Sequence, residues 1–307
     1  MLLLFLRCGQ KQAKSEQVSS DSIQTQKIAK YQDGKYPFQR EENGVTWTVV
    51  DTGLYVTEMD LPKSDYSDSK ATIIKINPYI HELQLLCVKE DDKDKIGGLT
   101  AKDWAKKKDM LLVVNAGMFD GKNKEGVFDG YTNRGLMKNK NYTNNDQVFE
   151  SKTMKAVLAF QPREKGIAPI KIIDLVNENL ADYLSQYHCY SQCLRLVDTK
   201  QKNVYPKNNL KWSMIVVAID KSGQLLFIFT RAPYTMWNHI NTLLKLPLNI
   251  YNMMYLEGGP ETSLYLNHHG VVIEKFGSYE TNFYQTDNND RFWELPNVLA
   301  IKKNRNE

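Results

Sequence analysis

Short apolar runs separated by polar turn residues dominate the sequence from Val45 to the C-terminus. Most carry β-branched or aromatic residues, and runs of this length and composition are typical of β-strands. The clearest runs are 45–50, 73–76, 83–87, 111–114, 157–160, 170–173, 194–197, 214–219 and 225–229. Two turn segments, 221–223 and 267–270, each separate a pair of apolar runs and therefore predict β-hairpins.

Three segments predict helices. Thr100 begins a capping box, which predicts a helix that continues to about Lys108. A second helix is expected over 177–187. A third begins near Thr235, carries apolar residues at helical spacing, and is stopped by Pro247. Many strands with few helices favour an α+β fold: a single domain with a large mixed β-sheet and a few packed helices.

The N-terminus indicates export. Residues 2–6 are apolar and are followed by Arg7 and Cys8, which resembles the end of a bacterial lipoprotein signal. We expect residues 1–8 to be a truncated signal, 9–38 a flexible polar tether and 39–307 the folded domain. The protein would then be exported and lipid-anchored through Cys8 in the bacterial cell envelope, in the periplasm or at the cell surface. The short apolar run and Arg7 leave a cytosolic protein as the alternative.

Charge and cysteine content exclude several classes. The 40 basic and 36 acidic residues give a net charge of +4, so neither a nucleic-acid partner nor a membrane surface is expected, apart from the lipid on Cys8. The basic run 106–108 is interpreted as a solvated helix end. Four cysteines are too few for a disulfide scaffold. Cys189 and Cys193 could pair across a turn, but two buried thiols are favoured.

The first motif that carries chemistry is the stretch 111–119, where a buried strand runs into Asn115-Ala116-Gly117-Met118-Phe119. Such a junction places Asn115 at the sheet end, and Gly117 leaves the backbone free for close approach of a ligand. The alternative is an ordinary strand-to-loop turn.

The second motif is the stretch 253–263, where a strand delivers Glu257 into Gly258-Gly259, with Ser263 shortly after. Successive backbone N–H groups in a glycine turn form a concave anion site. A carboxylate at its rim could act as acid, base or metal ligand. A tight turn with a solvated glutamate is the alternative.

Together the two motifs resemble the Asn-Ala-Gly-Met/Phe-Phe and Asp-Gly-Gly-Gly-Ser signatures of the phosphodiester glycosidase family. A third family signature is loosely matched by 192–197, and the resemblance covers roughly residues 45 to 303. The family includes the lysosomal uncovering enzyme, which removes N-acetylglucosamine from a sugar phosphodiester, and many exported bacterial proteins. This chain departs from the family pattern at Glu257, Pro260 and Glu261, which indicates altered activity or another substrate.

The resemblance implies a hydrolase that cleaves the glycosidic bond of a sugar phosphodiester on a cell-surface or periplasmic glycan, so a carbohydrate or sugar phosphate is the expected partner. Catalysis is assigned to Glu257 and Asn115, with Asp120, Asp129 or Glu261 as the second carboxylate that glycoside hydrolysis requires. Arginine suits phosphate because its planar fork binds two oxygens. The predicted substrate-binding residues are Gly117, Phe119, Arg134, Gln192, Arg195, Arg231, Gly258, Gly259 and Ser263.

Two other functions stay open. One is a non-catalytic protein that binds glycans or cell-wall polymers in the same cleft. The other is a metal-assisted phosphodiesterase that uses the same carboxylates as ligands. No cofactor is required by the sequence, although a divalent cation is compatible with it. The five histidines show no metal-ligand spacing, and His268 and His269 are interpreted as turn residues.

Overall fold

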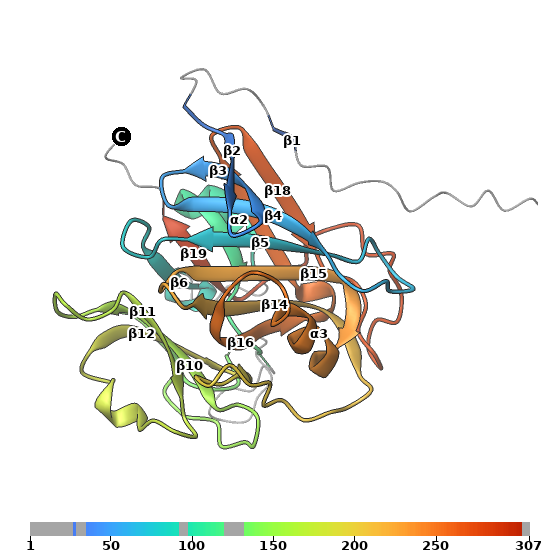
Figure 1. Ribbon diagram of the computed structural model, residues 1–307. Coiled ribbons are helices and arrows are strands. Elements are labelled where there is room, and N and C mark those ends of the chain that lie inside the picture. Colours follow the sequence, from blue (N-terminus) through green and yellow to red (C-terminus); the bar gives the residue numbers. More distant parts are fainter. Residues whose placement is uncertain (1–26, 29–34, 92–97, 120–131, 303–307) are drawn as a thin grey trace, which may run out of the picture.

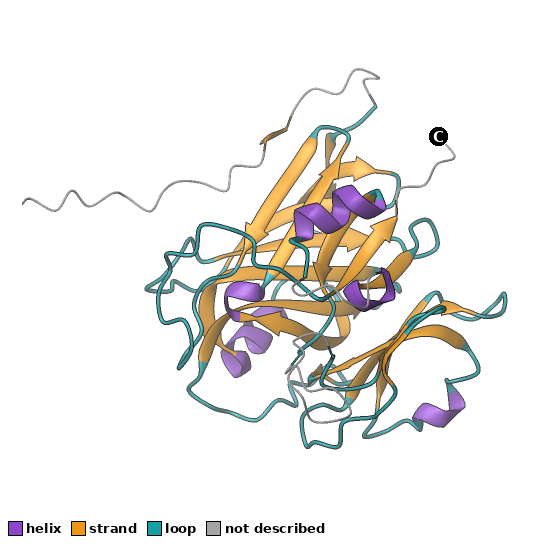
Figure 2. Ribbon diagram, turned by 180° about the vertical axis from the view of Figure 1, so that it is seen from behind, coloured by secondary structure: helices purple, strands orange, loops and turns teal. Residues whose placement is uncertain are grey.

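The computed structural model describes residues 27–28, 35–91, 98–119 and 132–302. Within these residues the protein is mostly β, with strands in three sheets and every strand pair antiparallel (Figures 1 and 2). The predicted α+β fold with one large mixed sheet is therefore wrong. Parallel pairing needs long crossover connections, whereas the hairpin turns at 221–223 and 267–270 join neighbouring antiparallel strands as predicted.

The largest sheet has eight strands and occupies the middle of Figure 1, with β2 and β3 at the top and β14 and β16 lower down. Its order is β13 (Arg195–Val197), β16 (Ile250–Gly258), β14 (Lys211–Asp220), β15 (Leu225–Thr235), β5 (Lys70–Ile76), β4 (Leu54–Asp60), β3 (Val45–Asp51) and β2 (Phe38–Glu42). The central strands β14 and β15 are buried along most of their length, as expected for near-continuous apolar runs.

The second sheet has six strands and places the first motif beside the second. Its order is β1 (Lys27–Ile28), β18 (Val271–Phe276), β17 (Ser263–His268), β7 (Met110–Asn115), β19 (Asn297–Lys302) and β6 (Leu83–Cys87). β7 pairs with both β17 and β19. Asn115 at the end of β7 therefore lies next to the start of β17.

The third sheet has five strands, and β10, β11 and β12 lie at the lower left of Figure 1. Its order is β11 (Ile170–Asp174), β10 (Ala156–Pro162), β12 (Tyr187–Cys193), β8 (Met137–Lys138) and β9 (Thr143–Asn145). Cys189 and Cys193 are both free thiols on β12. Four residues along a strand span roughly 13 Å, so the two cannot form a disulfide.

The helices are short. They are α1 (Val88–Asp91), α2 (Ala101–Lys108) and α3 (Met236–Leu243), with the 3₁₀ turns η1 (Leu180–Asp182) and η2 (Gly259–Glu261). Thr100 caps α2 as predicted, and α3 begins after Thr235, near the position predicted for its start. The helix expected over 177–187 is absent and is replaced by η1 and the start of β12. No residue of η1 is fully buried, and only Leu180 and Tyr183 pack partly against a hydrophobic cluster. This contact is too small to stabilise a longer helix.

One hydrophobic cluster joins the three sheets. It includes Leu112 of the six-stranded sheet, Leu158 of the five-stranded sheet and Val216 of the eight-stranded sheet, all fully buried. A smaller cluster forms where Trp104 of α2 packs against Val113 of β7. β7 is therefore buried on both faces, which fixes the position of Asn115 at its end.

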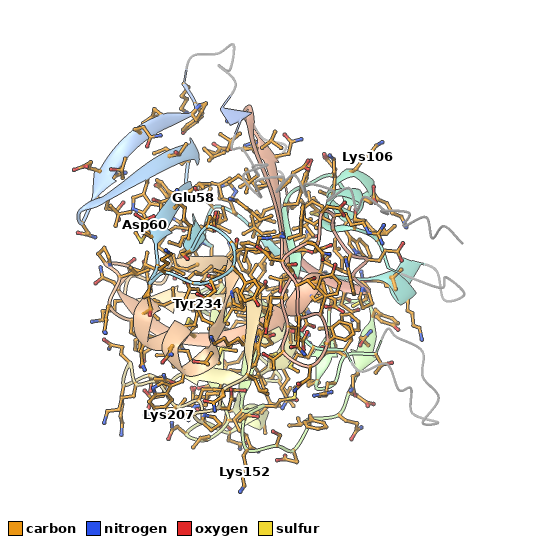
Figure 3. All side chains as sticks on the ribbon, turned by 90° about the vertical axis from the view of Figure 1, so that its right-hand side faces the viewer. Glu58, Asp60, Lys106, Lys152, Lys207 and Tyr234 are labelled. Carbon is orange, nitrogen blue, oxygen red and sulfur yellow. The ribbon has the colours of Figure 1, made fainter. Side chains whose placement is uncertain are left out.

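Basic side chains are dispersed over the surface. Figure 3 shows Lys106 on the opposite side of the view from Lys152 and Lys207. Lys106 and Lys107 are exposed near the end of α2, as expected for a solvated helix end. Among the described residues, no helix is both long enough and apolar enough to cross a membrane.

Candidate active site

Asn115 joins the two motifs. It is 1% exposed, and both ends of its side-chain amide are occupied by backbone groups. Its Nδ2 donates to the carbonyl of Glu261 at 2.8 Å, and its Oδ1 accepts from the N–H of Ser263 at 2.6 Å. The Ser263 hydroxyl donates to the same Glu261 carbonyl at 2.9 Å. Asn115 and Ser263 thus hold the turn that carries Glu261.

Three glutamates gather around this turn. Glu257 lies near the end of β16, Glu261 ends η2, and Glu280 comes from the segment after β18. Gly259 makes this gathering possible, because its φ is +68° and a Cβ atom there would lie 2.2 Å from Glu280 Oε2. A Cβ on Gly258 would lie 2.2 Å from the Tyr255 hydroxyl. Both glycines therefore allow side chains to approach the backbone closely.

The electrostatics favour protonated carboxyl groups. Burial, followed by the negative charge of Glu261, raises the pKa of Glu257 well above its ordinary value, while the N–H of Gly258 and Arg134 act in the opposite direction. Burial, with a contribution from Glu280, raises the pKa of Glu261 to about 7. Burial also raises the pKa of Glu280. The three carboxyl groups are half-buried neighbours, and like charges placed this close do not all ionise together, so this site holds protons near neutral pH.

The loop after β7 supplies a positive charge. Arg134 donates its backbone N–H to the carbonyl of Met118 at 2.8 Å, and Phe119 forms an isolated bridge with Asn133. Gly117 has a φ of +141°, and a Cβ atom there would lie 2.9 Å from Asn133 Oδ1. The predicted residues Gly117, Phe119 and Arg134 are therefore neighbours. Arg134 is close enough to Glu257 to lower its pKa.

Gln192 is a structural clamp. Its side chain is fully buried, and its Oε1 accepts from the N–H groups of Leu136 and Phe149 at 3.0 and 2.9 Å. Its Nε2 donates to the carbonyls of Phe149 and Met154 at 3.0 and 2.7 Å. A Cβ on Gly135 would lie 2.4 Å from Gln192 Oε1. Gln192 therefore ties the Arg134 loop to the 149–154 segment through backbone contacts.

The other two predicted arginines are occupied by the protein itself. Arg195 Nη2 donates to Asp174 Oδ2 at 2.6 Å, and its side chain is 13% exposed. Arg231 Nε donates to Asp287 Oδ1 at 2.8 Å. Its Nη atoms donate to the carbonyls of Phe276, Asp287 and Asn289. Both guanidinium groups tie segments of the fold together.

Two residues of the site, Glu280 and Tyr255, were not predicted from the sequence, and two predicted carboxylates lie outside the described residues. Glu280 belongs to no motif, and it reaches the site because it forms a bridge with Trp212 on β14. Tyr255 is buried near Glu257, and burial raises the pKa of its hydroxyl well above the ordinary value. The candidate carboxylates Asp120 and Asp129 fall outside the described residues.

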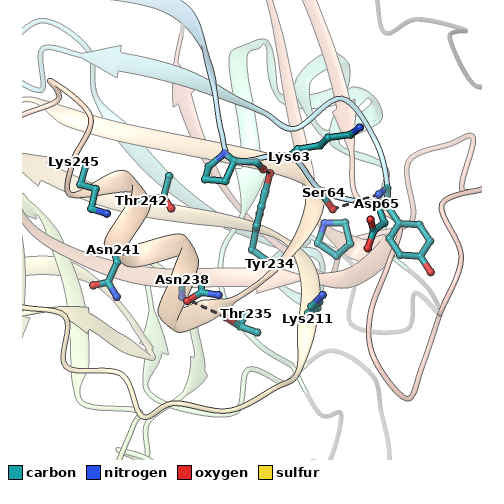
Figure 4. Close-up of a pocket in the computed structure, with 13 residues that line it drawn as sticks. Lys63, Ser64, Asp65, Lys211, Tyr234, Thr235, Asn238, Asn241, Thr242 and Lys245 are labelled. Atoms are coloured by element: carbon teal, nitrogen blue, oxygen red, sulfur yellow. Dashed lines mark hydrogen bonds between the residues drawn. The ribbon is translucent and has the colours of Figure 1, made fainter.

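A pocket of about 460 Å³ lies beside the segment that carries Glu280 (Figure 4). It is lined by Pro62, Lys63, Ser64, Asp65, Tyr66, Lys211, Pro233, Tyr234, Thr235, Asn238, Asn241, Thr242 and Lys245. The Tyr66 ring packs 4.8 Å from that of Tyr279, and the N–H of Lys211 donates to Thr281 Oγ1 at 2.9 Å. With three lysines and one aspartate, the lining carries net positive charge.

The three glutamates do not form a compact metal-ligand group. In the described part of the chain, the group whose ligand atoms all lie within 4.8 Å of one another is Asp51 with His268 and His269. The glutamate cluster is suited to proton transfer, because its carboxyl groups hold protons near neutral pH.

Comparison with known proteins identifies the family. A model of the phosphodiester glycosidase family matches residues 108–302, more than half of the 307-residue chain. No curated protein matches the sequence. A hypothetical protein from Synechocystis is 12% identical with a TM-score of 0.49, and the match covers 87% of this chain and 64% of that protein. This chain therefore spans less than two thirds of the length of the Synechocystis protein.

The catalytic domain of zebrafish N-acetylglucosamine-1-phosphodiester α-N-acetylglucosaminidase, auto-inhibited by its pro-peptide, is 13% identical with a TM-score of 0.49. That match covers 91% of this chain and 87% of the zebrafish chain. The family assignment rests on the matched residues 108–302, which contain the Asn115 motif, the Gln192 motif and the glutamate turn. The resemblance inferred from these motifs is confirmed, and the chain belongs to the phosphodiester glycosidase family.

Proposed function

We propose that this protein is a hydrolase that cleaves the glycosidic bond of a sugar phosphodiester, with Glu257 as the general acid. The observation that carries the proposal is the gathering of Glu257, Glu261 and Glu280 around one turn. Burial raises the pKa of all three, and neighbouring carboxylate charges add to the shift at Glu257 and Glu261. A carboxyl group that stays protonated near neutral pH can donate a proton to a leaving oxygen.

Two carboxyl groups with different pKa values would divide the work. Glu257 would protonate the phosphate oxygen as the bond from the anomeric carbon to that oxygen breaks. Glu261, with a pKa of about 7, would accept a proton from water, which forms the new bond to the anomeric carbon. Glycosidases commonly use such a pair. The activity would rise as Glu261 ionises and fall at higher pH as Glu257 loses its proton.

The phosphate would face Arg134 and the lysine-lined pocket. A phosphodiester carries a negative charge, and its binding beside carboxylates needs a cation nearby. Arg134 is the guanidinium whose charge lowers the pKa of Glu257, whereas Arg195 and Arg231 form ion pairs with Asp174 and Asp287. Lys211 and its pocket could hold an anionic extension of the substrate.

Glu257→Gln tests the proposal, because it keeps the side-chain shape and removes the titration. We expect turnover of an N-acetylglucosamine phosphodiester to fall by roughly a hundredfold or more, with binding retained. Glu274→Gln is the matched control, because Glu274 pairs with Lys102 on the surface and should keep full activity. Equal turnover in Glu257→Gln and in the wild type would contradict the assigned role.

The same assay separates the two other functions. Hydrolysis in ¹⁸O-labelled water places the label in the sugar if the carbon–oxygen bond breaks, and in the phosphate if a phosphodiesterase breaks the phosphorus–oxygen bond. Binding of the sugar phosphate without any turnover by the wild type would indicate a glycan-binding protein.

We further propose that the protein works outside the cytoplasm, anchored through a lipid on Cys8. This rests on the apolar residues before Cys8 and the polar stretch after it. Both segments lie largely outside the described residues. Fractionation of cells that express the wild type or Cys8→Ser checks the proposal, and membrane recovery that is equal for both would contradict the anchor.

A further inference from the structure

Two neighbouring histidines meet a carboxylate at the end of the β17–β18 hairpin. His268 ends β17, His269 follows it in the turn, and Asp51 ends β3. His268 Nε2 lies 2.5 Å from Asp51 Oδ2, and the two imidazole rings stack with centroids 3.8 Å apart. One nitrogen or oxygen atom from each of the three side chains lies within 4.8 Å of the others. Two segments that are 217 positions apart thus bring three metal-ligating side chains together.

The surroundings hold these side chains in place. Asp51 Oδ1 accepts the N–H of Thr52 at 2.6 Å. The Tyr36 ring stacks on His269 with centroids 5.5 Å apart. The side chains of His268 and Asp51 are 15% and 13% exposed. The group is therefore largely shielded but keeps the access to solvent that an entering ion needs.

A third histidine lies beside the group. His81 is 3% exposed, and its Nε2 lies 2.8 Å from the carbonyl of Thr52, so the proton is on Nε2. Within the described residues its Nδ1 has no hydrogen-bond partner. Burying the His81 Nδ1 atom without a partner lowers the stability of the fold. Three of the five histidines of this chain therefore gather at one place.

An ion pair between His268 and Asp51 does not account for this arrangement. Such a pair needs one imidazole and leaves the second ring, which stacks on the first, unexplained. Neutral imidazoles with a carboxylate are a ligand set that suits Zn²⁺ and related first-row ions. A shared cation would attract all three side chains at once.

We propose that Asp51, His268 and His269 bind one divalent first-row metal ion of the zinc class, with water completing the coordination. In a tetrahedral site with metal–nitrogen distances of about 2.0–2.1 Å, neighbouring ligand atoms are ~3.4 Å apart. The His268–Asp51 separation of 2.5 Å is shorter than that value, and all three ligand atoms lie within 4.8 Å of one another, so side-chain rotations would complete the site. This site is separate from the glutamate cluster and does not depend on the glycosidase activity.

The ion would join two hairpins. Asp51 lies at the turn between β3 and β4, and the histidines lie at the turn between β17 and β18. These turns come from the eight-stranded and six-stranded sheets. Because the ligands are brought together only by folding, the ion would bind the folded chain in preference to the unfolded chain and raise its melting temperature.

The experiment is a zinc titration of the full chain, purified without a histidine tag and stripped with a chelator. Competition with a fluorescent zinc chelator gives the affinity and stoichiometry, and Co²⁺ absorption reports on the coordination. We expect one ion per chain. Each of His268→Gln, His269→Gln and Asp51→Asn should weaken binding by at least about tenfold. His188→Gln is the control, because His188 lies on β12, outside the group, and it should bind zinc as the wild type does.

Circular dichroism of the metal-free proteins separates lost ligands from lost folding. Asp51→Asn is the most conservative change, because the amide keeps the size of the side chain and can still contact His268. The proposal is overturned if a folded Asp51→Asn or His268→Gln variant binds zinc as tightly as the His188→Gln control. It is also overturned if the wild type binds less than one ion per chain.

Discussion

Replacing Gln192 tests whether the third motif is structural or binds substrate. Gln192→Leu keeps most of the volume of the side chain, so the cavity contribution is small. It removes the partners of two N–H groups and two carbonyls, which belong to Leu136, Phe149 and Met154. Each buried group left unpaired costs about 1–3 kcal/mol. Even at the lower limit, four such groups give a loss of about 4 kcal/mol.

Urea unfolding followed by tryptophan fluorescence measures this loss. Gln186→Leu is the matched control, because it makes the same change where the side chain gives one exposed bond, to the carbonyl of Asp182. The control should lose less than about 1 kcal/mol. The structural interpretation of Gln192 would be refuted if Gln192→Leu lowered the free energy of unfolding by less than about 2 kcal/mol and raised only KM. That result would indicate that Gln192 contacts the substrate.

Two further predictions concern the glutamate turn. The pKa of Glu261 is raised to about 7 in the folded protein and is about 4.3 in an unfolded chain. The unfolded state therefore loses its proton first, and the folded state loses stability as pH rises between these values. Thermal melts should show Glu261→Gln gaining stability relative to the wild type between about pH 4.5 and about pH 7.5; a difference independent of pH would contradict the shift. Gly259→Ala and Gly166→Ala should each lower the free energy of unfolding by about 1–2 kcal/mol, because both glycines have a positive φ. Only Gly259→Ala should lose activity, because only at this position does the added Cβ atom clash with Glu280. Equal activity of the two variants would show that the position of Glu280 is unimportant.

Local sequence signals predicted the elements well. Thr100 caps a helix where expected, α3 begins near Thr235, and the turns at 221–223 and 267–270 form hairpins. These local signals do not determine how the strands pair, because the same apolar run fits a mixed sheet or an antiparallel one. The expected α+β fold failed for this reason. The helix expected over 177–187 failed because its apolar side chains are at most partly buried over η1, and such limited packing does not stabilise a longer helix.

The candidate site was only partly predictable. The motifs pointed to Glu257 and Asn115, which lie at the ends of β16 and β7 in two different sheets. They did not reveal that both polar atoms of the Asn115 side chain would bond to the backbone of Glu261 and Ser263. Nor could they pair Arg231 with Asp287, which follows 56 positions later. Glu280 and the Asp51–His268 contact depend on strand register. A motif identifies the residue types of a site, whereas long-range pairing decides which of them face the substrate.

The position of β19 has a consequence for how the chain matures. This strand is formed by the last described residues, Asn297–Lys302, yet it lies between β7 and β6 rather than at the edge of its sheet. β7 thus lacks one neighbour until residue 302 has left the ribosome, and non-local pairing of this kind slows folding. In a nascent chain this sheet would stay incomplete until β19 is made. That delay would keep an exported chain competent to cross a membrane unfolded, and in a cytosolic chain it would instead lengthen exposure to chaperones and proteases.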